Sequence, residues 1–206
     1  MKKFLLLCVA FFWFTFLTKP IILSASEEKT PSIILRSTYK ELSNADVLAW
    51  QKSLHEQYKD KLDGNRIINH NYQVDIIDND KVVIDNATGL MWHQSGSEVA
   101  TTWQDAEKWI NNLNNQGYAG YTDWRFPTLE EAASLLKSGA DDNGLYIDSL
   151  FDKKQKYIWT GDGYAAPDRW YIDFDEGKAL WSSKWIYGFN RNLRINYVRP
   201  VRTSRK

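Results

Sequence analysis

The residues most able to form a binding site are basic and lie near the C-terminus. Between residues 184 and 206 the chain has seven lysine and arginine residues and no acidic residue. Arginine binds planar anions such as sulfates and carboxylates through two parallel hydrogen bonds. The segment therefore predicts contact with an anionic partner, such as a sulfated or acidic glycan. A solvated terminal strand followed by a tail is the alternative.

Three tryptophans lie just before this segment or inside it, and aromatic faces are common platforms for sugars. Burial in the core is the alternative for each, because an indole ring buries a large apolar area. Side chains alternate along a strand, so only some of the arginines share one face unless Pro200 changes the register. The predicted binding residues are Trp170, Trp181, Lys184, Trp185, Arg191, Arg194, Arg199 and Arg202.

The sequence contains no recognisable catalytic constellation. His55, His70 and His93 are isolated, without a spacing that places two imidazoles on one metal. No activated-serine pattern is present. Asp173 and Asp175 would share one strand face, which is more typical of a solvated surface than of a glycosidase site. We therefore predict no catalytic residue, no metal ligand and no cofactor.

Two oxygen-rich segments resemble calcium loops at first sight. Residues 141–144 read Asp-Asp-Asn-Gly, and residues 78–80 read Asp-Asn-Asp. Neither has the ligand order of an EF-hand loop. Both are typical of turns, and turns are the prediction.

The N-terminus has the pattern of a secretory signal. Lys2 and Lys3 precede an apolar run over residues 4–17, and small residues follow at 24–26. The run is shorter than the roughly 20 residues of a spanning helix. We predict a signal peptide at residues 1–26 and export to the periplasm, the cell surface or the medium. An uncleaved anchor is the alternative, and it would be the chain's only link to a membrane.

Removal of this segment would change both charge and redox chemistry. The only cysteine, Cys8, lies within it, so the mature chain would contain no thiol or disulfide. Loss of three lysines would leave 23 basic against 26 acidic side chains, a net charge of about −3. This balance argues against a nucleic-acid partner.

The remaining chain divides into a linker at residues 27–41, a helical segment at 42–72, one domain at 73–202 and a tail at 203–206. Ser43 and Asp46 form a helix-capping pattern. Behind them Val47, Trp50, Leu54 and Tyr58 lie on one helical face. This helix is expected to pack on the domain, and partner binding is the alternative.

The domain itself is expected to be α+β. A hairpin is predicted over residues 73–84, and further strands over 157–160, 170–174, 179–182 and 193–201. Helices begin at Thr102 and Thr128 and end near Gly117 and Gly139. The aromatic residues expected in the core are Trp92, Trp103, Trp124 and Trp159. Arg125 is expected to pair with Asp123 or a more distant acid.

Several motifs occur in an order that resembles the bacterial Lcl C-terminal domain family. They are ATGLMW at 87–92, GYTDWRFPT at 120–128, WYIDFDEG at 170–177 and YVRPVR at 197–202. The resemblance implies a C-type lectin-like fold over residues 73–202. The adhesin that names the family resembles a binder of sulfated glycosaminoglycans, which implies an anionic glycan as partner. This chain lacks the collagen-like repeats of that adhesin.

Our leading hypothesis is an exported, non-catalytic binding or adhesion module that recognises an anionic glycan or a surface protein. One alternative is a cell-envelope enzyme acting on a polysaccharide or an exported protein. Another is a structural envelope component. Two close, partly buried carboxylates in a pocket would favour the enzyme, and an exposed aromatic and basic shelf would favour the binder.

Overall fold

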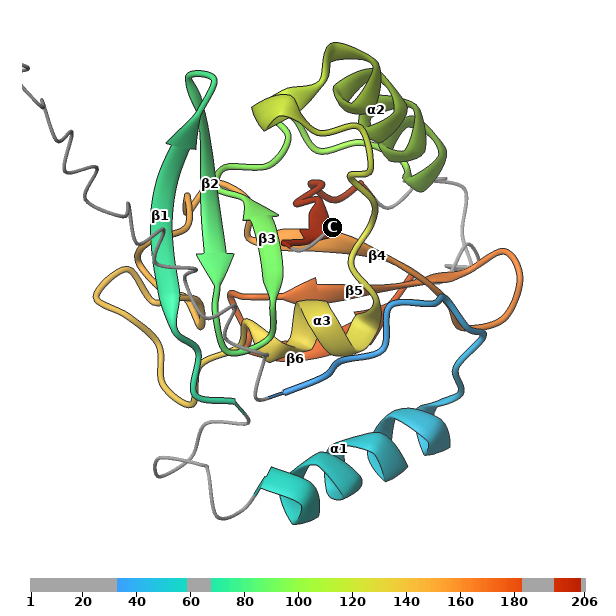
Figure 1. The fold of residues 1–206 in the computed structure, drawn as a ribbon. Coiled ribbons are helices and arrows are strands. Elements are labelled where there is room, and N and C mark those ends of the chain that lie inside the picture. The colour runs from blue at the N-terminus through green and yellow to red at the C-terminus, as the bar shows by residue number, and fades with distance from the viewer. Residues whose placement is uncertain (1–32, 59–67, 183–194, 205–206) are drawn as a thin grey trace, which may run out of the picture.

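The computed structural model describes residues 33–58, 68–182 and 195–204, and it has the expected mixture of helices and antiparallel strands (Figure 1). Its helices are α1 (Asn44–Tyr58), α2 (Trp103–Gln116), α3 (Leu129–Ser134) and the 3-10 helix η2 (Tyr118–Gly120). Within the described ranges, the search for a helix both long and apolar enough to cross a membrane found none. The predicted signal peptide lies outside the described residues.

The strands form two antiparallel sheets. One has the order β1-β2-β3-β7, from β1 (Tyr72–Ile77), β2 (Asp80–Asp85), β3 (Leu90–His93) and β7 (Val201–Thr203). The other has the order β4-β5-β6, from β4 (Tyr157–Gly163), β5 (Arg169–Asp173) and β6 (Lys178–Trp181). In the first hairpin Asp78 and Asn79 both have positive φ, 50° and 73°, as the two-residue turn of a twisted hairpin requires. The hairpin predicted over residues 73–84 is confirmed.

The four edges of these sheets are covered to different extents. Beside β7 the backbone of Arg125 bridges to Val201, and beside β4 the backbone of Tyr197 bridges to Ile158. Among the described residues, β1 and β6 have no strand on their outer side. The β1 edge is partly blocked, because the N–H of Ile76 donates to the carboxylate of Asp75 at 2.8 Å.

Helix α2 begins and ends where its capping residues predict. The side chain of Thr102 accepts from the N–H of Asp105, and Gly117 ends the helix in the left-handed conformation at φ 69°. Ala106, Ile110 and Leu113 form its buried face.

Helix α3 begins as predicted but ends earlier. Thr128 and Glu131 form a complete capping box. The helix ends at Ser134 rather than near Gly139, because the N–H of Lys137 donates to the carbonyl of Tyr146 instead of continuing the helix. The prediction of its C-terminus was therefore wrong.

The aromatic core is confirmed and the terminal strand is not. Trp92, Trp124 and Trp159 are buried, and Trp103 is half-buried against Phe126 at a ring distance of 5.0 Å. In the described part of the segment 193–201, where a strand was expected, the observed strand is β7, which begins after Pro200, a residue that has no N–H to donate.

Residues 33–43, most of them inside the predicted linker, form a strap across the domain. The guanidinium of Arg36 donates to both carboxylate oxygens of Asp162 at 2.9 and 2.8 Å and to Glu130 at 3.1 Å. The same Asp162 carboxylate accepts from the N–H of Lys40 and from that of Leu129 at the start of α3. The strap thus holds its own path and the start of α3 through one buried acid.

Candidate functional site

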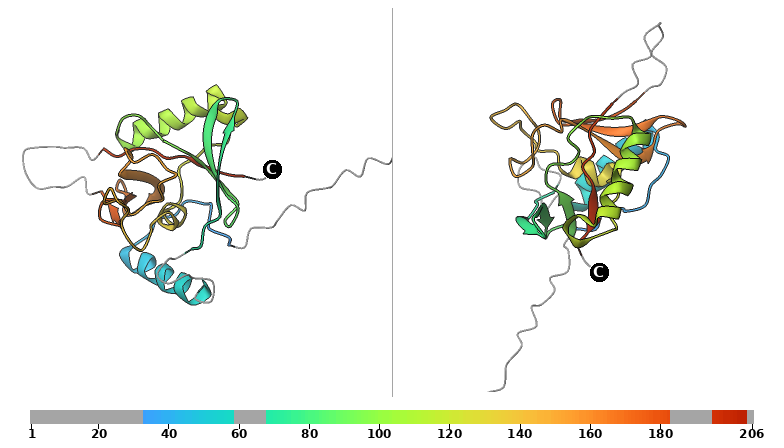
Figure 2. Two further views of the ribbon diagram at one scale, coloured as in Figure 1. Left: turned by 90° about the vertical axis from the view of Figure 1, so that its left-hand side faces the viewer. Right: turned by 90° about the horizontal axis from the view of Figure 1, so that it is seen from above.

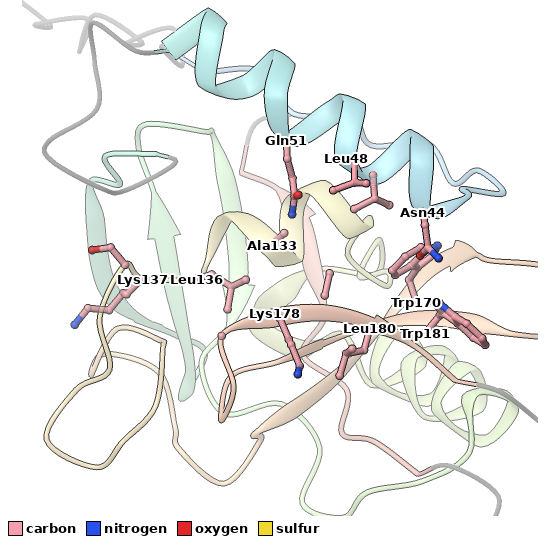
Figure 3. Close-up of a pocket in the computed structure, with 14 residues that line it drawn as sticks. Asn44, Leu48, Gln51, Ala133, Leu136, Lys137, Trp170, Lys178, Leu180 and Trp181 are labelled. Atoms are coloured by element: carbon pink, nitrogen blue, oxygen red, sulfur yellow. The ribbon is translucent and has the colours of Figure 1, made fainter. Parts of the chain in front are cut away.

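A groove of about 460 Å³ lies between α1, the end of α3 and the β6 side of the second sheet (Figure 3). We call it the α1–β6 groove. Figures 1 and 2 show that α2 lies on the opposite side of the molecule from α1, so the groove is remote from that helix. Its lining residues are Asn44, Val47, Leu48, Gln51, Ala133, Leu136, Lys137, Ser138, Trp170, Gly177, Lys178, Ala179, Leu180 and Trp181.

Helix α1 forms one wall, and the strap positions its first turn. The N–H of Leu42 donates to the carbonyl of Gly163, and the indole N–H of Trp170 donates to the carbonyl of Leu42. The hydroxyl of Ser43 accepts from the N–H of Asp46, whose carboxylate accepts in return from both the hydroxyl and the N–H of Ser43. These hydrogen bonds from Ser43 lower the pKa of Asp46. The cap was predicted, and it is confirmed.

The wall is apolar but incompletely packed. Val47 is buried, whereas Leu48 remains 66% exposed although it lines the groove. In Figure 3 the side chains of Leu48 and Gln51 extend from α1 toward α3 and the sheet. A large aliphatic side chain left in water on a groove wall is available to a ligand.

Aromatic rings form one end of the groove. Trp181 stacks on Tyr164 with ring centroids 4.1 Å apart, and Tyr164 meets Trp170 edge-on at 5.6 Å. Trp170 is a core residue, since it is 2% exposed. Trp181 is half-buried and lines the groove. Of these two predicted binding residues, Trp181 is accessible to a ligand, whereas Trp170 is buried in the core.

The opposite end of the groove is basic. Lys137 and Lys178 lie toward this end in Figure 3, and Asn44 and Trp181 toward the other. Lys178 pairs with Glu176, and the hydrogen bond that its ammonium group donates to that carboxylate raises the pKa of Lys178. Among the described residues Lys137 forms no ion pair. The lining contains two ammonium groups and no carboxylate, so its chemistry suits an anionic ligand.

The edge of β6 presents unused backbone groups along the groove. The N–H of Ser182, one residue beyond β6, donates to the carbonyl of Arg169 in β5 at 3.0 Å. Because backbone groups alternate in direction along an antiparallel pair, those of Ala179 and Trp181 point away from β5. Within the described part of the chain, these N–H and C=O groups have no hydrogen-bond partner.

Arg199, a predicted binding residue, is an internal clamp. It is 0% exposed and donates to the carbonyls of Gln94 and Asp152 and to the side chain of Gln155. Its guanidinium lies over the ring of Phe151 at 4.9 Å. Burial lowers the pKa of Arg199 to about 9. We therefore remove Arg199 from the predicted binding face.

Arg202 is also internal. It is 1% exposed, donates to the carboxylate of Asp123 at 2.6 Å and lies over Tyr121 at 3.6 Å. Arg125 pairs with Glu131 through two hydrogen bonds of 2.7 Å. Its partner is thus the more distant acid and not Asp123. Arg202 is therefore also removed from the binding face. The other predicted binding residues, Lys184, Trp185, Arg191 and Arg194, lie outside the described residues.

The residues considered for catalysis have structural roles in the described part of the chain. The N–H of Gly96 donates to Nδ1 of buried His93, whose ring stacks on Tyr118 at 4.1 Å. Burial, with a smaller contribution from the charge of Arg199, lowers the pKa of His93 to about 3. The ring of His70 bridges the carboxylate of Asp85 and the carbonyl of Ser134 at 2.7 and 2.6 Å.

The acidic residues considered for catalysis or for calcium binding also bond to neighbouring groups of the fold. Asp173 accepts from the N–H groups of the hairpin turn at residues 175 and 176, and Asp175 pairs with Lys156 at 3.0 Å. Asp141 accepts from the N–H of Asn143 and pairs with Lys153 at 2.7 Å. A search of the described residues for groups of three or more metal-binding side chains found none.

Sequence reasoning missed several groove residues, chiefly Asn44, Leu48, Gln51, Leu136 and Lys137. The available signal was Leu48, which lies next to Val47 in the sequence and adds a second large aliphatic side chain beside the predicted apolar face of α1.

Comparison with known proteins agrees with the motifs. The model of the Lcl C-terminal domain family matches residues 81–202, more than half of the 206-residue chain. No curated protein and no solved structure matches the chain at a significant level. The match includes the β6 side of the groove and leaves out α1 and the strap. The chain therefore belongs to the Lcl C-terminal domain family.

Proposed function

We propose that this protein is an exported, non-catalytic binding module that uses the α1–β6 groove to hold an anionic ligand of a cell surface. The observation that carries the proposal is the lining of the groove. It combines a half-buried indole, the exposed side chain of Leu48 and two lysines, and among the described residues it contains no carboxylate. An acid–base enzyme acting on a polysaccharide needs a pair of carboxylates, and this groove has none to supply.

Membership of the family supports export and a surface role. The signal-like residues 1–26 agree with export, and a C-type lectin-like fold is the finer architecture that we propose for the α+β domain. Such a fold uses a packed scaffold to present binding residues, and it does not by itself define a ligand. The groove chemistry therefore carries more weight than the fold.

The basic segment that follows β6 in the sequence also belongs to the proposal. Lys184, Trp185, Arg191 and Arg194 follow β6 directly in sequence, after the strand that forms the groove edge. We propose that these residues add to the attraction for anions, in place of the internal Arg199 and Arg202. Both sulfated glycans and acidic surface proteins fit this charge.

The test is a binding screen of the full chain against sulfated glycosaminoglycans and acidic polypeptides at low and physiological salt. Lys137→Ala/Lys178→Ala should weaken binding, and the salt dependence should become shallower. Lys108→Ala is the matched control, since Lys108 lies on α2, is 75% exposed and pairs only with Asp105. Equal binding by the double variant and the control, or no binding to any anion, would contradict the proposal.

A further inference from the structure

We infer that the α1–β6 groove binds an extended acidic peptide of a protein partner, which adds to the β4-β5-β6 sheet as a strand beside β6. The inference rests on the proposed function and names the partner of that site. It predicts main-chain recognition, which a glycan cannot provide.

The backbone of β6 has groups that an added strand can pair with. The N–H and C=O groups of Ala179 and Trp181 point to the open side of the sheet and have no partner in the described part of the chain. An added strand pairs with such groups through alternating hydrogen bonds, and this mode of recognition is common in peptide-binding domains. Four residues of β6 offer roughly 13 Å of edge, at about 3.3 Å per residue.

The edge at β1, in the other sheet, is less suited to an added acidic strand than the edge at β6. At β1 the outward N–H of Ile76 is already bonded to the carboxylate of Asp75, and that carboxylate would also repel an acidic strand. At β6 the outward groups are unblocked within the described part of the chain, and the charged side chains of the lining are lysines. An edge N–H that is already bonded cannot pair with a further strand, and among the described residues the outward N–H groups of β6 are not bonded in this way.

The groove beside β6 has walls that suit the two faces of an extended peptide. Helix α1 and the end of α3 border the β6 edge, and Leu48 and Leu136 line the space that they leave. Along an extended peptide successive side chains point to opposite sides. One set would contact these aliphatic walls, and the alternate set would reach the two lysines. The expected ligand therefore alternates apolar and acidic residues.

The probe is a six-residue peptide of alternating valine and glutamate with blocked termini, titrated against the full chain. Two N-methylated versions carry the methyl groups on alternate residues, either on all the valines or on all the glutamates. Strand addition uses only one of these sets of N–H groups. One version should lose at least 10-fold in affinity and the other should bind almost as the parent does. Equal effects of the two versions would overturn the inference.

Ala179→Pro tests the same claim from the protein side. Ala179 does not donate to β5, so proline there removes an outward N–H without breaking the pairing of β5 and β6. We expect at least a 10-fold loss of peptide affinity. Val74→Pro is the matched control, because Val74 lies on the open β1 edge between Gln73 and Asp75, whose N–H groups face β2. It should leave peptide affinity unchanged.

The remaining outcomes separate this inference from the proposed function. A sulfated glycan that binds in a Lys137-dependent manner, without any binding of the peptide, would overturn the peptide inference and leave the proposed function in place. Failure of both ligands would overturn both. An unfolded Ala179→Pro variant would leave the N-methylated peptides as the deciding measurement.

Discussion

The domain interior and the α1–β6 groove both contain charged side chains, and the arginines of the interior are bonded within the fold. Arg125 binds Glu131, Arg202 binds Asp123, and Arg199 binds three loop acceptors. In the groove Lys137 has no ion pair among the described residues, and the β6 edge has unbonded backbone groups. A charged residue is thus a poor guide to function until its partners are known.

Breaking an interior pair should have the largest effect. Arg125→Met leaves the fully buried Glu131 carboxylate without its guanidinium partner. Loss of one member of a buried pair costs roughly 3–5 kcal/mol in the free energy of unfolding. Urea denaturation at pH 7 measures this loss. At a temperature where the variant is folded, its affinity for groove ligands should match that of the wild type, and a selective loss of binding would link the pair to the groove.

The buried histidine should make interior stability depend on pH. The pKa of His93 is about 3 in the folded chain and about 6.5 when exposed, so its contribution is complete above pH 6.5 and falls as the pH approaches 3. At pH 4 the loss is on the order of 3 kcal/mol, at 1.36 kcal/mol per pKa unit.

His93→Gln provides the comparison, since glutamine has no proton to gain in this range. The difference between the unfolding free energies of wild type and variant should shrink as the pH falls from 7 to 4. A constant difference would mean that His93 does not resist protonation in the folded state.

A single substitution in the groove should scarcely change stability. Leu48→Glu replaces a 66% exposed side chain, and surface substitutions usually stay within about 0.5 kcal/mol. It places an acid beside the lysine-lined cavity, so affinity for anionic ligands should fall several-fold. Ala45→Glu adds the same charge at an exposed position of α1 outside the groove lining. Equal losses of affinity for both variants would indicate a long-range charge effect and would contradict binding in the groove.

Local structure followed from the sequence wherever one or two residues determine it. Thr102, Thr128 and Gly117 define helix ends through their own caps, and Asp78 with Asn79 defines the first hairpin. The end of α3 did not follow, because it depends on a hydrogen bond between Lys137 and Tyr146, nine residues further along the chain.

The candidate site was harder to predict for the same reason. Arg199 and Arg202 have the same sequence signal as surface arginines, and only the fold places acceptor carbonyls and Asp123 around them. The groove joins residues 44–51, 133–138 and 170–181, which are far apart in the chain. Trp170 and Trp181 have the same sequence signal, and only the fold shows that Trp170 is a core residue and that Trp181 is half-buried on the ring of Tyr164.

Amide hydrogen exchange of the full chain, with and without a bound acidic ligand, tests the central claim most directly. The open edges of β6 and β1 provide an internal comparison between Ala179 and Trp181 on one side and Val74 on the other. The account predicts that ligand slows exchange at Ala179 and Trp181 and leaves Val74 unchanged. Saturating acidic peptide that protects neither β6 amide, or that protects Val74 instead, would contradict strand addition beside β6 in the α1–β6 groove.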